Sequence, residues 1–225
     1  MMESEFLATM ALTFKLATII TLILLLIGIP LAAFLVFSTM RFKSIIETIV
    51  SMPLVLPPSV LGFYLLLAFS PASAIGSFLT EHGIRLAFSF EGLVIGSVLF
   101  SLPFMVHPIQ SALTQVPPSI FEAAYTLGKS KLETMVRVIL PSIRHGLISG
   151  IVLAFAHTVG EFGVILMIGG NIPGETRVAS IAIYDEVESL NYAMAHQYAL
   201  TLFVVTFAIL LLVYTLNKKS LGGIR

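Results

Sequence analysis

The chain has 225 residues, with 12 basic and 12 acidic side chains, no cysteine, and 57% apolar residues. Only 11% of its residues are charged, against about 25% in a soluble domain, and the mean hydropathy is +1.02, so we expect an integral membrane protein in contact with the lipid bilayer. The zero net charge argues against a nucleic acid partner, and the absence of cysteine excludes disulfides and thiolate metal sites.

Five apolar stretches come close to the length of about 20 residues with which a helix crosses a bilayer. They cover approximately residues 12–37, 53–69, 90–112, 143–168 and 198–216. The strands of a membrane barrel would instead be short and alternating. The expected fold class is therefore all-α, a polytopic helical membrane protein in which residues 1–225 form a single transmembrane domain.

The second stretch contains two adjacent prolines, Pro57 and Pro58, followed by Ser59. A proline inside a helix removes a main-chain hydrogen bond, so we expect a break that leaves main-chain groups unpaired at membrane depth. Such groups need partners within the protein or a water-lined path. A kinked scaffold helix and the lining of a solute path are the two alternatives here. Residues 70–89 are expected to form a loop, because Gly, Ser and Pro recur in them.

Glycine pairs in the third and fourth stretches, Gly92 with Gly96 and Gly146 with Gly150, have the small-xxx-small spacing that suits close contact between membrane helices. After the fourth stretch, residues 179–190 are expected to form an amphipathic helix that ends in an acidic cluster. These patterns predict helix packing and an amphipathic surface, but they identify no catalytic or binding residue.

The interval at residues 119–140 carries two capping-box spacings, Ser119 with Glu122 and Ser130 with Glu133. In such a box the serine hydroxyl accepts from the first turn of a helix and the glutamate reaches back to the main chain. The spacing therefore predicts two short helices, one after the other, between two membrane spans.

The ends of these two helices are also marked. Gly128 is expected to end the first in a left-handed conformation, and Pro141 is expected to end the second, because it lacks the N–H that a helix interior needs. A pair of short capped helices does not cross the bilayer. We therefore expect this interval to present a face to a partner in the water.

The fourth stretch contains a histidine and a glutamate, His157 and Glu161, four residues apart. A charged residue at membrane depth costs about 2.5–3.5 kcal/mol on insertion scales, so Glu161 is either functional or buried at an interface. This spacing places both side chains on one helical face, where they could be two ligands of a metal ion. No third ligand is near in sequence, so a buried hydrogen bond between the two side chains is favoured.

Motifs of catalysis are missing from the sequence. It has no H-E-x-x-H, no G-x-S-x-G and no G-x-x-x-x-G-K-[ST], so it has no P-loop with which to bind ATP. We expect no catalytic residue and no cofactor. Broken helices at membrane depth favour a solute path, which suggests a transport subunit that takes its energy from a partner.

The basic residues fix the expected orientation, because cytoplasmic loops carry the excess of Lys and Arg. Nine basic residues fall on the side of the 119–140 interval and three on the other. The nine are Arg41, Lys43, Lys129, Lys131, Arg137, Arg144, Lys218, Lys219 and Arg225, and the three are Lys15, Arg85 and Arg177. We therefore expect the amino end outside, the carboxyl end in the cytoplasm, and the capped helices in the cytoplasm.

The capped interval resembles the EAA motif of ABC importer permeases, which reads E-A-A, three residues, G, nine residues, I-x-L-P. The chain keeps this spacing, with Val138 in place of the isoleucine. The resemblance implies a type I importer permease architecture in which residues 119–140 form coupling helices in a cleft of a separate ABC ATPase. The coupling residues that it implies are Glu122, Ala123, Ala124, Leu127, Gly128, Leu140 and Pro141.

Longer stretches, among them MPLVLPPSVLGFYLL, SLPFMVHPIQSAL and GEFGVILMIGGNIPG, resemble the molybdate permeases, and the resemblance covers nearly the whole chain. His107 and His157 stand where many relatives carry arginine. The resemblance implies inward transport of molybdate, with tungstate as a second solute, across the cell (inner or plasma) membrane. It also implies an extracytoplasmic molybdate-binding protein. One five-span chain has too few helices to enclose a path, so we expect a homodimer with two ATPase subunits.

A weakly polar path is then sufficient, because the binding protein holds the affinity for the oxyanion. The candidate path residues are Pro57, Pro58, Ser59, Thr158 and Glu161. Three alternatives stay open at this point. The chain could be a sulfate or thiosulfate permease, since those share the EAA region and a G-E-[FY]-G segment; a membrane metalloenzyme that uses His157 and Glu161; or a channel that needs no ATPase.

Overall fold

The structure is a computed structural model that describes the main chain of residues 2–221 and the side chains of residues 3–215. Arg225, one of the basic residues counted above, lies outside the described residues. The described chain is built of helices and contains no strand, as expected for the all-α class. Among the described residues, three helices are long and apolar enough to cross a membrane, Glu3–Phe37, Phe90–Thr114 and Tyr192–Thr215, and two bent helix pairs would raise the number to five.

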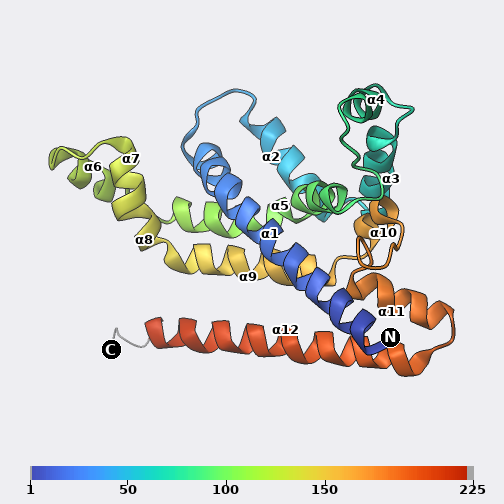
Figure 1. The fold of residues 1–225 in the computed structure, drawn as a ribbon. Coiled ribbons are helices and arrows are strands. Elements are labelled where there is room, and N and C mark those ends of the chain that lie inside the picture. The colour runs from blue at the N-terminus through green and yellow to red at the C-terminus, as the bar shows by residue number, and fades with distance from the viewer. Residues whose placement is uncertain (1, 222–225) are drawn as a thin grey trace.

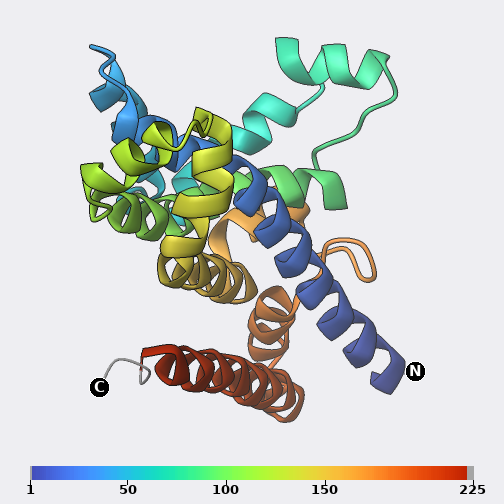
Figure 2. The same ribbon diagram turned by 90° about the vertical axis from the view of Figure 1, so that its left-hand side faces the viewer.

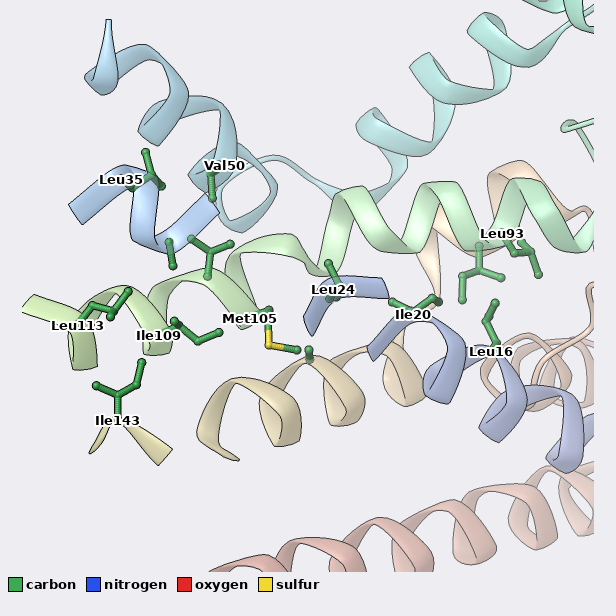
Figure 3. Close-up of a cluster of buried hydrophobic side chains, with 14 of the residues drawn as sticks. Leu16, Ile20, Leu24, Leu35, Val50, Leu93, Met105, Ile109, Leu113 and Ile143 are labelled. Atoms are coloured by element: carbon green, nitrogen blue, oxygen red, sulfur yellow. The ribbon is translucent and has the colours of Figure 1, made fainter. Parts of the chain in front are cut away.

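The core lies where three long helices cross, α1 (Met2–Phe37), α5 (Phe90–Thr114) and α9 (Arg144–Gly160). Side chains four residues apart form a ridge on α1 and another on α5, and such ridges interdigitate between packed helices. Both ridges are buried in the core, as Figure 3 shows: Leu16, Ile20 and Leu24 on α1, and Met105, Ile109 and Leu113 on α5.

The glycine pair on α9 lies at its contact with α5, as the spacing predicts. A Cβ atom at Gly146 would lie 2.4 Å from the Cβ of Ala112, and one at Gly150 would lie 3.0 Å from the carbonyl oxygen of Met105. In a membrane the association of helices depends on close packing rather than on the hydrophobic effect. The missing side chains are therefore what allows these two helices to approach so closely.

The second apolar stretch is broken at its prolines, as expected. The chain runs through α2 (Lys43–Ser51) and a 3-10 turn (Met52–Leu54), bends by 110°, and continues as α3 (Pro58–Phe69). Pro57 precedes α3 and Pro58 is its first residue, so neither ring sits inside a helix.

The 70–89 interval is not wholly a loop, because it contains α4 (Ala74–Glu81). Its N-cap is Ser73, whose hydroxyl accepts a hydrogen bond from the N–H of Gly76 at 2.8 Å. Serine is a preferred N-cap residue, but the many Gly, Ser and Pro residues of this interval led to the prediction of a loop.

The fourth apolar stretch is not one helix, contrary to the expectation for residues 143–168. α9 ends at Gly160, and α10 (Gly163–Gly169) starts after a two-residue joint, Glu161 and Phe162, and packs on α3. The physical reason is a close approach at this joint: a Cβ at Gly163 would lie 2.7 Å from the Cβ of Pro58.

The remaining helices are α11 (Ala179–Glu188) and α12 (Tyr192–Leu221). Figures 1 and 2 show α12 as a separate layer that meets the rest of the molecule mainly through α11. Only 6% of its most apolar stretch is buried within the chain. An apolar helix with so little internal contact must be covered by lipid or by protein.

Candidate functional site

The coupling interval forms an element of its own at one end of the molecule (Figure 1). It consists of α6 (Pro118–Thr126), α7 (Lys131–Thr134), a π turn (Met135–Ile139) and α8 (Leu140–Ser142). α8 meets α9 at a bend of 75°. The element is thus joined directly to α9, one of the three helices that form the core.

Gly128 ends α6 as predicted, with φ of +74°. The N–H of Lys129 donates to the carbonyl of Ala124 at 3.0 Å, and the N–H of Gly128 donates to the carbonyl of Tyr125 at 2.9 Å. These two bonds form a Schellman motif, which satisfies carbonyls that a helix end otherwise leaves free. The turn between the two coupling helices is therefore fixed by main-chain geometry.

Only one of the two predicted caps is present. The Ser130 hydroxyl accepts from the N–H of Glu133 at 3.2 Å, which confirms the second cap. The first prediction is wrong, because the N-cap of α6 is Pro117 and Ser119 lies inside the helix. Pro118 accounts for the earlier start: its fixed φ suits the first helical position, where a missing N–H costs nothing.

Pro141 does not end the second helix, since α8 continues to Ser142 and the bend follows at Ile143. The π turn just before it explains the difference. In this wider turn the N–H of Leu140 reaches back to the carbonyl of Met135, and the changed register accommodates a ring that would clash in a regular α-helix. Turns of this type occur often at functional sites.

Apolar side chains are exposed on the coupling element. Leu127 is 79% exposed, Leu132 74% and Val136 52%. Beside them lies a groove of about 530 Å³ between this element and the end of α1. It is lined by Phe37, Val116, Pro118, Phe121, Glu122, Tyr125, Lys131 and Met135. Outside a membrane, an exposed apolar surface of this kind marks a contact with another protein.

The coupling residues implied by the EAA motif do not all face outward. Ala124 is only 5% exposed and packs into the protein, whereas Ala123 is exposed. Glu122, Leu127 and Gly128 are exposed as well. The outward face of α6 and of the turn that follows it is therefore defined by these exposed positions, and the role of each in coupling stays a prediction.

The candidate path residues gather around the joint between α9 and α10. The start of α3 lies against it, because a Cβ at Gly163 would also lie 3.4 Å from the main-chain N of Ser59. Thr158 and Glu161 are buried, at 2% and 3% exposure, whereas Ser59 is exposed. The structure thus brings together positions about 100 residues apart in sequence, and whether they line a path stays a prediction.

A chain of three polar side chains links α5 to α9 beside this joint. The Ser101 hydroxyl lies 2.9 Å from His157 Nδ1 and 3.1 Å from Thr158 Oγ1, and Thr158 donates to the carbonyl of Ala154 at 2.9 Å. All three contacts are hydrogen bonds only if Ser101 donates to Thr158 and His157 Nδ1 donates to Ser101. Sequence analysis missed Ser101, because a lone serine in an apolar stretch carries no signal.

His157 and Glu161 do not share a helical face and are not bonded to each other, so the favoured hydrogen-bonded pair and the alternative of two metal ligands are both wrong. The imidazole is bonded to Ser101 instead, and neither carboxyl oxygen of Glu161 has a hydrogen-bond partner among the described residues. α9 ends at Gly160, and the main chain is extended at Glu161, with ψ of 134°. The His157 ring instead stacks on Phe104, with the ring centres 3.9 Å apart. Within the described residues no three His, Cys, Asp or Glu side chains are grouped in a way that could hold a metal ion.

Charged residues at the opposite end of the molecule tie α1 to α11. The guanidinium of Arg177, whose side chain is 11% exposed, lies 3.3 Å from Glu5, 3.0 Å from Asp185 and 3.3 Å from Glu186. The amide of Asn191 donates to the other oxygen of Glu186 at 2.7 Å. This cluster anchors the amino end of α1, and its groups are largely paired among themselves.

Comparison with known proteins agrees with this architecture. Residues 24–221 match the model of the family described as "Binding-protein-dependent transport system inner membrane component". The chain is 43% identical over 217 residues to the molybdenum transport system permease protein ModB of Azotobacter vinelandii, covering 96% of each. It is 33% identical over 176 residues to the sulfate transport system permease protein CysT of Synechocystis, covering 78% of this chain and 62% of CysT.

Solved structures have the same fold. A bacterial ABC transporter for import of alginate superposes with a TM-score of 0.80 at 19% identity, over 96% of this chain and 79% of that one. The MetNI methionine ABC transporter gives a TM-score of 0.75 at 14% identity, over 97% of both chains. The chain is thus a multi-pass membrane protein with the fold of a type I ABC importer permease, and it belongs to the family of binding-protein-dependent transport system inner membrane components.

Proposed function

We propose that this chain is the membrane-spanning permease of an ATP-driven importer of molybdate, with tungstate as a second solute. The observation that carries the proposal is the 43% identity to the molybdenum permease of A. vinelandii over 96% of both chains. The sulfate permease of Synechocystis is matched over only 62% of its length. A sulfate or thiosulfate permease is therefore the second candidate, on the strength of its 33% identity.

The exposed face of α6 and α7 is proposed to dock on a separate ABC ATPase. Leu127 and Leu132 stand out from it, and the Schellman turn at Gly128 holds them in place. The element and the carboxyl end of α12 lie at the same end of the molecule, opposite the amino end (Figure 1). That arrangement agrees with a cytoplasmic carboxyl end and an outer amino end, as the basic residues predict.

The proposed assembly is a homodimer of the permease with two ATPase subunits and an extracytoplasmic molybdate-binding protein. A single transmembrane domain with three to five spanning helices encloses no path alone, and the little-buried α12 leaves an apolar surface to be covered. The proposed path passes the start of α3, at Pro57, Pro58 and Ser59, and the joint at Thr158 and Glu161.

Uptake into proteoliposomes tests the solute. The permease, the ATPase and the binding protein are reconstituted together, and labelled molybdate is offered with ATP inside. We expect an excess of tungstate to compete and an excess of sulfate not to compete. Strong competition by sulfate would transfer the assignment to the second candidate, and uptake that persists without the ATPase would contradict an importer.

Substitution of the exposed leucines tests the docking face. If Leu127 and Leu132 are the anchors of this face, Leu127→Ala and Leu132→Ala should each weaken binding of the ATPase by more than about fivefold, since truncation of the few dominant residues of an interface costs more than about 1 kcal/mol each. Leu26→Ala is the matched control, because Leu26 is 76% exposed but lies in the apolar α1. If all three variants bind the ATPase equally, this face is not the docking surface.

A further inference from the structure

The joint between α9 and α10 holds a carboxyl group in an unusual environment. Glu161 is 3% exposed, in the two-residue interruption between the helices. Neither carboxyl oxygen has a hydrogen-bond partner among the described residues, and none of their ion pairs involves this glutamate. A buried polar group without a partner in a native protein requires an explanation.

The groups that surround the joint carry no compensating charge. From α5 the hydroxyl of Ser97 faces the carboxyl group, but Ser97 is fully buried and also lacks a hydrogen bond of good geometry. On α9 the nearest titratable residue in sequence is His157, whose Nδ1 is bonded to Ser101.

Two further helices, α11 and α3, bring polar groups to the joint but, among the residues that the structure describes, no cation. From α11, Ser180 donates to the main-chain carbonyl of Glu161 at 2.6 Å, and the titratable ring of Tyr184 packs on Phe162 with ring centres 5.0 Å apart. From α3 the contact is made by Pro58.

The protonation state of the carboxyl group follows from this environment. An ionised carboxylate that is buried without a partner is far costlier than a neutral acid. A bound sodium or magnesium ion would require several oxygen ligands around it, and the described residues offer the carboxyl group little besides Ser97. A proton needs no such shell, because a neutral carboxylic acid can donate to one hydroxyl and accept from it.

We propose that Glu161 and Ser97 form a proton-binding site, occupied in the conformation described and able to exchange its proton with water when the joint opens. When the proton leaves at high pH, the O–H bond of the acid breaks, the electron pair stays on the carboxylate and the proton passes to water. The link to import rests on the proposed function. A neutral acid beside the path does not repel a dianion, whereas a carboxylate does, so passage of the anion requires the protonated form.

Infrared spectroscopy tests the proton without any transport. The full chain in lipid is compared with Glu161→Gln at neutral pH. We expect the wild type to show a C=O band of a protonated carboxyl group that the variant lacks, and Ser97→Ala to shift that band. Glu81→Gln, at an exposed position, is the control and should remove a carboxylate band instead.

A carboxylate band lost in Glu161→Gln would overturn the proposal. Should that variant not fold, titration of the wild type replaces it: a protonated carboxyl band that persists at neutral pH supports the proposal, and the absence of any such band refutes it. These outcomes are independent of the solute, so a failure of molybdate uptake would count against the proposed function alone.

The pH profile of uptake tests the release. With each profile scaled to its own maximum, wild-type uptake should fall by up to about tenfold per pH unit on the alkaline side, the slope of one titrating group. Glu161→Gln should lack this fall, since its amide does not titrate. Identical profiles for the two proteins would show that the proton stays bound through the cycle and would refute the release step.

Discussion

Gly128 offers a substitution that changes the main-chain preference of the coupling turn and little else. Its φ is +74°, and no atom lies within 4 Å of the position that a Cβ would take. Gly128→Ala therefore introduces no clash between side chains. It penalises the left-handed conformation by about 1–2 kcal/mol, and the Schellman turn that sets the angle between α6 and α7 should open in part of the population.

The expected loss of affinity for the ATPase follows from that conformational penalty. If the ATPase binds only the closed turn, a penalty of 1–2 kcal/mol weakens binding by at most about 5- to 30-fold, since 1.4 kcal/mol is a factor of ten. The assay is the affinity of the purified permease for the ATPase, measured beside the amount of permease inserted in the membrane. We expect lower affinity with normal insertion.

Two further variants show whether the cause is the main chain. Gly128→Asn should bind nearly as well as the wild type, because asparagine tolerates the left-handed conformation. Gly83→Ala carries the same strain, with φ of +75° and open space around it, but lies in the loop after α4 and should leave docking intact. Weak binding by Gly128→Asn, or full binding by Gly128→Ala, would refute the reasoning.

Three other predictions concern packing and charge. Gly146→Ala places a Cβ 2.4 Å from Ala112 and should destabilise the contact of α9 with α5 by about 1–3 kcal/mol, seen in thermal unfolding. Arg177→Ala removes three ion pairs with partly exposed acids, so it should cost about 1 kcal/mol and speed hydrogen exchange at the amino end of α1. The hydrogen bond from Lys129 holds the pKa of Glu133 below its usual 4.5, so the stabilising contribution of Glu133 is present at neutral pH and lost as the pH falls through that lowered pKa. Unfolding curves of the wild type and Glu133→Gln should thus differ at neutral pH and converge in acid.

Local signals in the sequence predicted much of the coupling element. The left-handed turn at Gly128 and the cap at Ser130 depend on residues within one helical turn of each other, so their spacing suffices. The same holds for the break at Pro57 and Pro58. Two overlapping patterns predict different first residues for α6. The capping box predicts a start after Ser119, whereas the fixed φ of Pro118 favours a start at Pro118, and the helix starts at Pro118.

The joint at Glu161 could not be predicted from its own stretch. Residues 143–168 are apolar throughout most of their length, and nothing near the joint indicates the end of a helix except Gly160 and Gly163, two of the four glycines in this stretch. The break depends on α3, more than 90 residues earlier, whose first residue Pro58 fits against Gly163. Ser97 and Ser101 were missed for the same reason, since only packing gives them partners.

The two candidate sites are connected by one continuous helix. α9 runs for 17 residues from the bend at Ile143, next to the coupling helices, to the joint at Glu161, a distance of about 25 Å at 1.5 Å per residue. Gly146 and Gly150 hold its first half against α5, while Gly160 at its far end has no neighbour within 4 Å of a Cβ. A displacement of the docked coupling element is therefore passed along a helix whose first half is held firmly against α5. The helical hydrogen bonding stops at the far end, because the main chain is extended at Glu161, so the joint is the place where this element can bend and separate Glu161 from Ser97.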